Sequence, residues 1–339
     1  MKQHSRSSNR RAFLAQMGTA AAITATGSQL FGAQPEPDKS APAIRKSTHT
    51  FKSVGPLAIQ ADVFRADDDI TRPVLFWIHG GALIGGNRAQ VSRQVKDAFL
   101  NAGYVVVSID YRLAPETKLP EIIADLRDAY NWLHEKGPTL FHADTRKVAV
   151  AGGSAGGYLT LMTGFAVQPR PAALVSLWGY GDLVGDWYSK PSEFYRKQPL
   201  VSKDDAWKEM SGSPIADGSI NGKQRGKFYL YCRQQGLWPK EVSGFDPKTE
   251  DRSFDPYSPV RNISKDYPPT MLIHGTNDTD VPYEQSVMMH KEFTKHGVVH
   301  EFITIPNAGH GIRDGDPKVV ASAYAAIVPF VDKYVRGGD

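Results

Sequence analysis

The sequence predicts an α/β fold, in which a mostly parallel, twisted β-sheet is covered by helices on both faces. Short apolar runs rich in β-branched and aromatic residues recur along the 339-residue chain, and segments with helical spacing separate most of them. Because neither face of a strand in such a sheet meets water, these strands read as continuous apolar runs. This order of strands and helices is typical of a parallel sheet.

Strands are expected wherever the apolar runs occur. The interval 57–66 should pair with the alternating segment 47–55 as an antiparallel hairpin at one edge of the sheet. Further strands are expected at 73–80, 104–111, 147–153, 173–179, 270–275 and 300–306, and helical spacing is clearest at 91–102 and 122–136.

One long segment breaks this rhythm. Between about 181 and 266 the chain offers no clear strand and is rich in proline, glycine, charged and aromatic residues. An insertion of this length between two strands is expected to fold over one end of the sheet as a cap. Its aromatic side chains should mostly form a small core of their own, with ligand contacts as the alternative.

The first residues are expected to be an export signal. Residues 1–33 contain the pair Arg10–Arg11 followed by a weakly apolar Ala/Thr/Gly run, which resembles a twin-arginine signal peptide. The run is short and polar for a membrane span, although an anchor or a frayed helix is the alternative. We therefore expect a periplasmic or secreted bacterial protein, with a linker at 34–48 and a folded domain at 49–339.

The charge balance excludes several kinds of partner. The formal net charge of +4 is accounted for by Lys2, Arg6, Arg10 and Arg11, so residues 34–339 are balanced. This balance implies no basic surface for nucleic acid or acidic lipid. Cys232 is the single cysteine, which excludes a disulfide within the chain.

A glycine-rich turn at 148–160, VAVAGGSAGGYLT, carries the first candidate for chemistry. A phosphate-binding loop would end in lysine followed by serine or threonine, and a dinucleotide turn would have the spacing Gly-x-Gly-x-x-Gly, but neither is present. The pattern is Gly-x-Ser-x-Gly, in which small neighbours allow a nucleophilic serine to stand exposed between a strand and a helix. Ser154 is therefore the candidate nucleophile, with a chance match on a glycine-rich turn as the alternative.

A serine hydroxyl needs a base, and the base needs an acid to orient it. Asp278 follows the strand at 270–275 and is preferred over its rival Asp280, two positions on. His310 lies on a glycine-flanked loop after the last strand and is the candidate base. The order Ser, Asp, His along the chain is the one that α/β hydrolases use. No metal site is expected, since the other late histidines lack ligand spacing.

Backbone N–H groups are expected to stabilise the negative oxygen of a tetrahedral intermediate. Gly80 and Gly81 follow the strand at 73–80, and Ala155 follows the nucleophile. We interpret His79 as a residue that orders this loop by a hydrogen bond. Residues 110–112 are interpreted as a buried structural network beneath the loop, with substrate contact as the alternative.

With these residues in place, the chain from about residue 50 onward resembles the α/β-hydrolase superfamily, and most closely the microbial carboxylesterases related to hormone-sensitive lipase. The resemblance is carried by HGG at 79–81, DYRLAPE at 110–116, GGSAGG at 152–157, HGTNDTDVP at 274–282 and GHG at 309–311. It implies an α/β-hydrolase fold, the catalytic triad Ser154, His310 and Asp278, and an oxyanion hole at Gly80, Gly81 and Ala155. The chain departs from the family pattern at Ala82, Leu83 and Gly153.

The function expected from these residues is hydrolysis of carboxylic esters through an acyl-enzyme, without a metal or organic cofactor. The substrate is expected to be a small-molecule or carbohydrate ester, with no nucleic-acid partner and no stable membrane insertion. An acetyl or feruloyl esterase acting on polysaccharide and a small-peptide serine hydrolase, which the HGTNDTDVP segment also resembles, are the alternative enzymes. A hydrolase fold that binds a small ligand without turnover is the alternative from another class.

Overall fold

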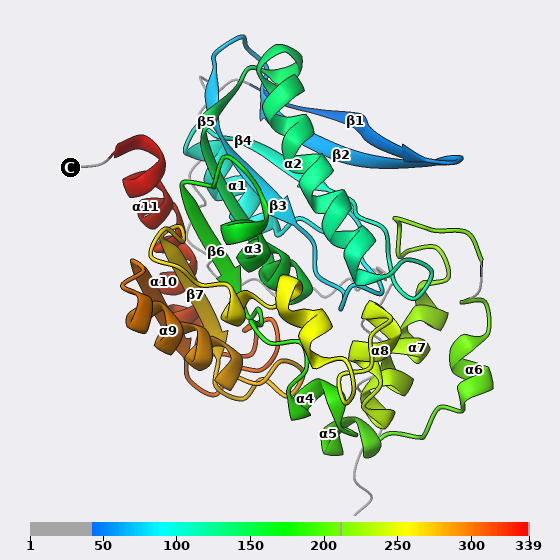
Figure 1. Ribbon diagram of the computed structural model, residues 1–339. Coiled ribbons are helices and arrows are strands. Elements are labelled where there is room, and N and C mark those ends of the chain that lie inside the picture. The colour runs from blue at the N-terminus through cyan, green and yellow to red at the C-terminus, as the bar shows by residue number, and fades with distance from the viewer. Residues whose placement is uncertain (1–42, 211, 338–339) are drawn as a thin grey trace, which may run out of the picture. The chain divides into compact units, whose positions relative to one another are not determined.

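A computed structural model describes residues 43–337, except residue 211. Within these residues, eight strands form one sheet in the order β1-β2-β4-β3-β5-β6-β7-β8 (Figure 1). The strands are β1 Ile44–Val54, β2 Leu57–Ala66, β3 Arg72–Ile78, β4 Val105–Ile109, β5 Ala143–Gly153, β6 Ala173–Leu177, β7 Thr270–Gly275 and β8 His300–Ile305. The pairs from β4 to β8 are parallel, and β2 is antiparallel to both of its neighbours. The predicted α/β class with a mostly parallel sheet is confirmed.

Alternate residues of each central strand pack on opposite sides of the sheet. In β3, Val74 and Phe76 belong to one apolar core, and Leu75 and Trp77 belong to the other. Helices cover both faces of the sheet (Figure 1). The first face carries α2 Leu119–Phe141, α3 Ala155–Ala166 and α9 Glu284–His296, and the second carries α1 Arg93–Asn101, α10 Pro317–Ala325 and α11 Ile327–Asp332, which η3 Lys333–Gly337 follows. Water is thus excluded from both faces, as the continuous apolar runs require.

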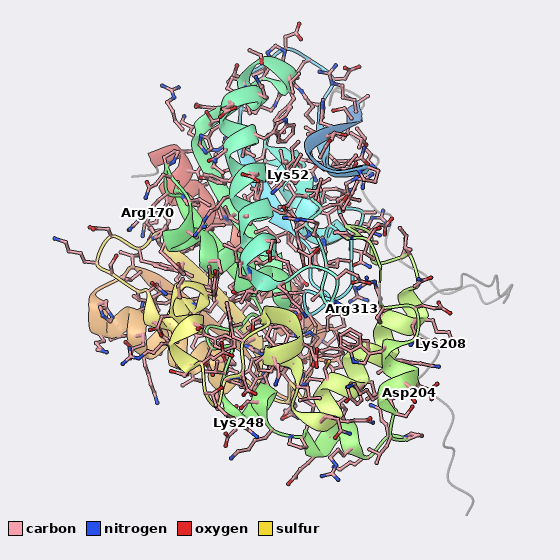
Figure 2. The ribbon with its side chains drawn as sticks, turned by 45° about the vertical axis from the view of Figure 1, so that its right-hand side comes forward. Lys52, Arg170, Asp204, Lys208, Lys248 and Arg313 are labelled. Carbon is pink, nitrogen blue, oxygen red and sulfur yellow. The ribbon has the colours of Figure 1, made fainter. Side chains whose placement is uncertain are left out.

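The antiparallel hairpin lies at the edge of the sheet, as predicted. β1 and β2 pair from Ile44 opposite Ala66 to Val54 opposite Leu57. The linker predicted at 34–48 is therefore wrong over residues 44–48, where β-pairing continues further toward the N-terminus than the alternation of apolar residues indicates. Lys52 of β1 joins this hairpin to α2. It forms ion pairs with Asp125 and Asp128 of α2 at 2.7 and 2.6 Å (Figure 2).

The predicted export signal at 1–33, together with most of the predicted linker, lies outside the described residues. It stays a prediction. Among the residues that the structure describes, no helix combines the length and the apolar character needed to cross a bilayer.

The segment between β6 and β7 is helical and contains no strand in its described residues. It contains α4 Asp186–Ser189, α5 Glu193–Arg196, α6 Lys203–Trp207, α7 Gly222–Gln235, α8 Trp238–Ser243 and the 3-10 turns η1 Asp251–Tyr257 and η2 Pro259–Arg261. Figure 1 shows the helices α4 to α8 grouped at one end of the sheet. We call residues 181–266 the insertion.

The insertion is attached to the loops that leave β3 and β4. The indole N–H of Trp238 donates to the carbonyl of Ala82 at 3.0 Å. The guanidinium of Arg225 donates to the carbonyls of Ile84 and Ala114 at 2.6 and 2.8 Å, and both side chains are buried. These loops follow the carboxyl ends of parallel strands, so the insertion covers the edge of the sheet where ligands bind in open α/β sheets.

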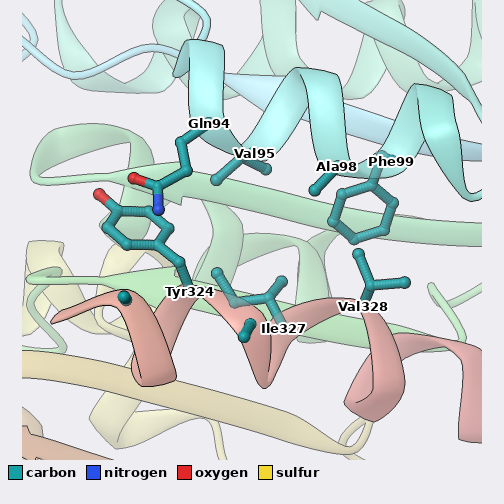
Figure 3. A pocket seen from close by; sticks show the side chains of 9 residues that line it. Gln94, Val95, Ala98, Phe99, Tyr324, Ile327 and Val328 are labelled. Atoms are coloured by element: carbon teal, nitrogen blue, oxygen red, sulfur yellow. The ribbon is translucent and has the colours of Figure 1, made fainter. Parts of the chain in front are cut away.

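A hollow of about 190 Å³ lies elsewhere, between α1 and the pair α10 and α11 (Figure 3). Its walls are mostly apolar and include Val95, Phe99, Tyr324 and Ile327. None of the residues predicted for the active site lines it.

Trp238→Ala tests the attachment of the insertion. The substitution removes a fully buried ring that stacks on Tyr188 at 4.0 Å between centroids, and it leaves the carbonyl of Ala82 without its donor. The free energy of unfolding should fall by about 3–5 kcal/mol. Urea denaturation measures it, with Leu200→Ala as the control, because that side chain is 63% exposed and its loss should change stability by less than about 0.5 kcal/mol. Equal stabilities of the two variants would contradict the attachment.

Candidate active site

Ser154 stands at the turn between β5 and α3, in a backbone conformation that most residues avoid. Its φ and ψ are 57° and −123°, and its N–H donates to the carbonyl of Leu177 at 2.9 Å. Such a conformation costs on the order of 1–3 kcal/mol and persists only where the surrounding structure enforces it. The hydroxyl is therefore presented at the carboxyl edge of the sheet.

The glycines on either side of Ser154 are required by close backbone contacts. A Cβ on Gly152 would lie 2.4 Å from the carbonyl oxygen of Gly156, and a Cβ on Gly156 would lie 2.1 Å from that of Ile78. Both contacts are with backbone, which has little freedom to yield. The spacing Gly-x-Ser-x-Gly thus follows from the packing of this turn against the end of β3.

The structure brings together the three residues predicted from distant parts of the sequence. Nε2 of His310 lies 3.1 Å from Oγ of Ser154, and Nδ1 of His310 lies 2.8 Å from a carboxylate oxygen of Asp278. The side chain of His310 is 28% exposed, whereas that of Asp278 is fully buried. With Nδ1–H donating to Asp278, the lone pair of Nε2 faces the hydroxyl.

Asp278 accepts four hydrogen bonds. The backbone N–H groups of Asp280 and Val281 donate to Oδ1, each at 2.9 Å, while His310 and His274 donate to Oδ2. Burial alone would raise the pKa of Asp278, but the hydrogen bonds and charges of the two histidines outweigh it and hold the pKa well below its usual range. Asp278 therefore remains ionised.

His274 is a site residue that sequence reasoning missed. Its ring is buried between Asp278, Ser286 and Val281, with Nδ1 at 2.7 Å from Oγ of Ser286 and Nε2 at 3.1 Å from Asp278. The signal was present, because His274 opens the motif HGTNDTDVP that also contains Asp278. Its role is to fix the rotamer of the carboxylate.

The backbone predicted to form the oxyanion hole lies beside the hydroxyl. A Cβ on Gly80 would lie 3.3 Å from Cβ of Ser154, and Gly81 has a φ of +107°, a conformation that favours glycine. Ala155 is the first residue of α3, where backbone N–H groups have no acceptor within the helix. Of the three predicted donors, Gly80 and Ala155 thus lie directly beside Ser154, and Gly81 follows Gly80 in the same loop.

His79 and the segment that follows β4 pack against the loop that carries Gly80 and Gly81. The ring of His79 stacks on Tyr111 with centroids 4.2 Å apart, and Nδ1 lies 2.7 Å from the carbonyl oxygen of Gly80. Burial lowers the pKa of His79 to about 4, so the ring is neutral at pH 7. Asp110 binds Arg88, and Arg112 binds Asp125 at 2.7 Å, so the segment forms a buried structural network, as predicted.

Asp280, the rival candidate for the acid, lies on the opposite side of the imidazole. Its Oδ2 is 3.5 Å from Nε2 of His310, and its Oδ1 is bound to Arg233 of α7 at 2.6 Å. Burial tends to lower the pKa of His310, but the charge of Asp280 and the hydrogen bond and charge of Asp278 outweigh this effect. The pKa of His310 is therefore raised above its ordinary value of 6.5. Arg233 was also missed by sequence reasoning.

No cluster that could hold a metal ion occurs among the residues the structure describes.

A sequence model described as the alpha/beta hydrolase fold family matches residues 75–313, which is most of the chain and contains every residue discussed at this site. The chain belongs to this family. The resemblance to the esterases related to hormone-sensitive lipase is thus confirmed at the level of the family.

Comparison with curated proteins finds a more distant relationship. The chain is 29% identical over 313 residues to the non-reducing polyketide synthase mapC' of Penicillium brevicompactum. The match covers 79% of this chain but 14% of the synthase, so the chain spans about one seventh of that relative's length.

Solved structures of esterases share the fold. Esterase 2 of Thermogutta terrifontis, phosphoramylated by tabun, has a TM-score of 0.60 and 19% identity, with 89% of this chain and 97% of that chain covered. A truncated carbohydrate esterase from gut microbiota has a TM-score of 0.62 and 19% identity, with 88% and 99% covered. At these identities the likeness establishes the fold alone.

Gly156→Ala tests the packing of the turn around Ser154. Because the added methyl group would overlap the carbonyl of Ile78, the free energy of unfolding should fall by about 1–3 kcal/mol. Gly226→Ala is the matched control: Gly226 lies within α7 with open space around its Cβ position, so alanine should raise stability by about 0.5–1 kcal/mol. Urea denaturation of both variants measures the difference, and a Gly156→Ala variant as stable as the wild type would contradict the packing described.

Proposed function

We propose that the protein hydrolyses carboxylic esters through an acyl-enzyme formed on Ser154. The observation that carries the proposal is that one imidazole, His310, lies within hydrogen-bond distance of both the hydroxyl of Ser154 and the carboxylate of Asp278. Membership of the α/β-hydrolase family and the shared fold with two esterases support it. The proposed oxyanion hole consists of the N–H groups of Gly80, Gly81 and Ala155.

In the first half-reaction, Oγ of Ser154 attacks the ester carbonyl as Nε2 of His310 takes the hydroxyl proton. The carbonyl oxygen becomes negative and receives hydrogen bonds from the backbone N–H groups. The bond between the acyl carbon and the alcohol oxygen then breaks, and His310 returns the proton to the departing alcohol. Asp278 holds the ring in the tautomer with a proton on Nδ1 and stabilises the imidazolium.

In the second half-reaction, water replaces the alcohol. His310 takes a proton from the water as its oxygen attacks the acyl carbon, and Ser154 recovers its proton when the acyl bond breaks. The products are the carboxylic acid and the free serine. The strained backbone of Ser154 keeps Oγ exposed to the ester in the first half-reaction and keeps the acyl group exposed to water in the second.

The aromatic residues of the insertion bear on the carbohydrate alternative. Tyr188, Phe228 and Trp238 are buried and pack with the central core, so their faces are not open for stacking on sugar rings. A carbohydrate ester remains a second candidate substrate because a carbohydrate esterase shares the fold. Rates on p-nitrophenyl esters of increasing acyl length, on acetylated xylan and on an aminoacyl-anilide distinguish simple-ester, carbohydrate and peptide hydrolysis.

Ser154→Ala tests the proposed nucleophile. The wild type should be labelled by a fluorophosphonate probe and should hydrolyse p-nitrophenyl acetate, whereas Ser154→Ala should take up no label and lose at least about 10³-fold in kcat. Intact mass spectrometry and absorbance at 405 nm measure the two effects.

Ser322→Ala is the matched control, because Ser322 is an exposed residue of α10 and its replacement should leave labelling and turnover unchanged. A wild type that stays unlabelled and inactive would favour a ligand-binding protein. Labelling retained in Ser154→Ala would assign the nucleophile to another residue.

The pH dependence of kcat/KM tests the role of His310. His310 accepts a proton only when neutral, so the rate should fall as pH drops through its pKa. Because Asp278 and Asp280 outweigh burial and the nearby charge of Arg233, and raise this pKa, the acid limb should lie above pH 6.5. Initial rates with p-nitrophenyl acetate between pH 5 and 9 give the midpoint, and a limb well below pH 6.5 would contradict the assignment.

A further inference from the structure

The insertion holds Asp280 in a fixed orientation beside the catalytic base. Three donors reach its Oδ1: the guanidinium of Arg233 at 2.6 Å, the hydroxyl of Tyr195 at 2.9 Å and the hydroxyl of Tyr229. Arg233 also donates to the backbone carbonyl of Asp280 at 3.0 Å. Burial raises the pKa of both tyrosines, so their hydroxyls stay protonated and donate. The capacity of Oδ1 to accept hydrogen bonds is therefore fully occupied by these donors.

The second oxygen of Asp280 points to the reacting groups. Oδ2 lies 3.5 Å from Nε2 of His310. The same nitrogen is hydrogen-bonded to Oγ of Ser154 at 3.1 Å. Within the part of the chain that the structure describes, no donor is hydrogen-bonded to Oδ2. The side chain of Asp280 is 20% exposed, so a small group that enters the site can approach this carboxylate.

We propose that Oδ2 of Asp280 accepts a hydrogen bond from a hydroxyl on the leaving alcohol, so that the preferred substrates are esters of vicinal diols such as glycerol, glycols or sugars. The inference rests on the proposed ester hydrolysis. The leaving oxygen must approach Nε2 of His310 to receive its proton, and Oδ2 lies 3.5 Å from that nitrogen. A hydroxyl on the adjacent carbon of the alcohol can then reach Oδ2.

The electrostatics of the pair favour a neutral donor over an ion. Arg233 forms an ion pair with Asp280 and is itself surrounded by four aromatic rings, with centroids 4.8–5.7 Å from the guanidinium carbon: Trp187, Tyr188, Tyr195 and Tyr229. A substrate ammonium group would therefore meet a carboxylate whose charge Arg233 already offsets in part. A substrate anion would find the guanidinium already bound to Asp280, Tyr229 and the carbonyl of Trp187. A hydroxyl satisfies Oδ2 without introducing a charge.

Asp280→Asn is the informative substitution because Arg233 dictates how the amide lies. Arg233 and the two tyrosine hydroxyls donate, so they select the amide oxygen at the position of Oδ1. The amide NH₂ then occupies the position of Oδ2, where it is a donor and cannot accept a hydrogen bond from the substrate hydroxyl. The change preserves shape and removes the acceptor.

The test compares three esters of the acid that the wild type hydrolyses fastest as a p-nitrophenyl ester: the 2-hydroxyethyl, 2-methoxyethyl and ethyl esters. The methoxy compound has the same electron-withdrawing oxygen as the hydroxyl compound but no donor. The wild type should prefer the hydroxyethyl over the methoxyethyl ester by about 10- to 100-fold in kcat/KM, the range that one hydrogen bond to a charged acceptor provides. Acid release in a pH-stat measures the rates.

In Asp280→Asn this ratio should fall to about 1. The ratio is taken within one protein, so a general loss of activity or of folded protein cancels. Tyr195→Phe is the matched control, because it removes one donor from Oδ1 and leaves Oδ2 in place; it should keep a clear preference for the hydroxyethyl ester.

Equal rates of the wild type on the hydroxyethyl and methoxyethyl esters would overturn the inference while leaving ester hydrolysis intact. An unchanged ratio in Asp280→Asn, or an equal loss of the ratio in Tyr195→Phe, would also overturn it. A wild type that hydrolyses no ester and takes up no fluorophosphonate would instead remove the proposed function, and the inference with it.

Discussion

The site depends on direct backbone contact between the turn at Ser154 and the end of β3. The carbonyl of Ile78 occupies the space where Gly156 would carry a side chain. Gly80 is similarly close to the turn, because a Cβ on Gly80 would lie 3.3 Å from Cβ of Ser154. This contact fixes the hydroxyl and the loop of Gly80 and Gly81 relative to each other before any substrate binds. Preorganisation of this kind is what makes backbone donors effective for a developing oxyanion, since they need not reorient during the reaction.

The second feature of the site is the environment of His310, which differs on its two sides. On the Nδ1 side, Asp278 is buried and saturated with four hydrogen bonds, so it can only orient the ring and stabilise its charge. On the Nε2 side, Asp280 is partly exposed, and only its Oδ1 accepts hydrogen bonds within the described residues. Both carboxylates lie on the loop after β7, but Asp278 is bound by His274 and His310, whereas Asp280 is oriented by Arg233 from the insertion. The insertion thus contributes to the environment of His310 as well as covering the sheet edge.

The features that depend on a local pattern of residues were predictable from the sequence. The strands were predicted because burial on both faces leaves an uninterrupted apolar run, and the candidate residues were found because each follows such a run on a glycine-rich or acidic turn. The start of β1 was misplaced because an edge strand is half exposed and its apolar signal fades toward Ile44. The partnership of Arg233 with Asp280 could not be predicted, because it joins α7 to a loop 47 positions away and neither residue carries a local signature.

The hydrogen bonds of His274 show a second limit of prediction from the sequence. The sequence placed it in the same motif as Asp278, but it did not indicate that the ring would turn toward the carboxylate and pair with Ser286. Side-chain direction at a strand end depends on packing against α9, which no nearby residue pattern encodes. The position of a functional loop is therefore better predicted than the hydrogen bonds that hold it.

The most direct measurement of the central claim is a crystal structure of the wild type after reaction with a phosphonate. The account predicts continuous density from Oγ of Ser154 to phosphorus, with one phosphoryl oxygen within about 2.7–3.1 Å of the N–H groups of Ala155 and of Gly80 or Gly81. Density for the adduct on another residue, or a phosphoryl oxygen directed away from these N–H groups, would contradict it.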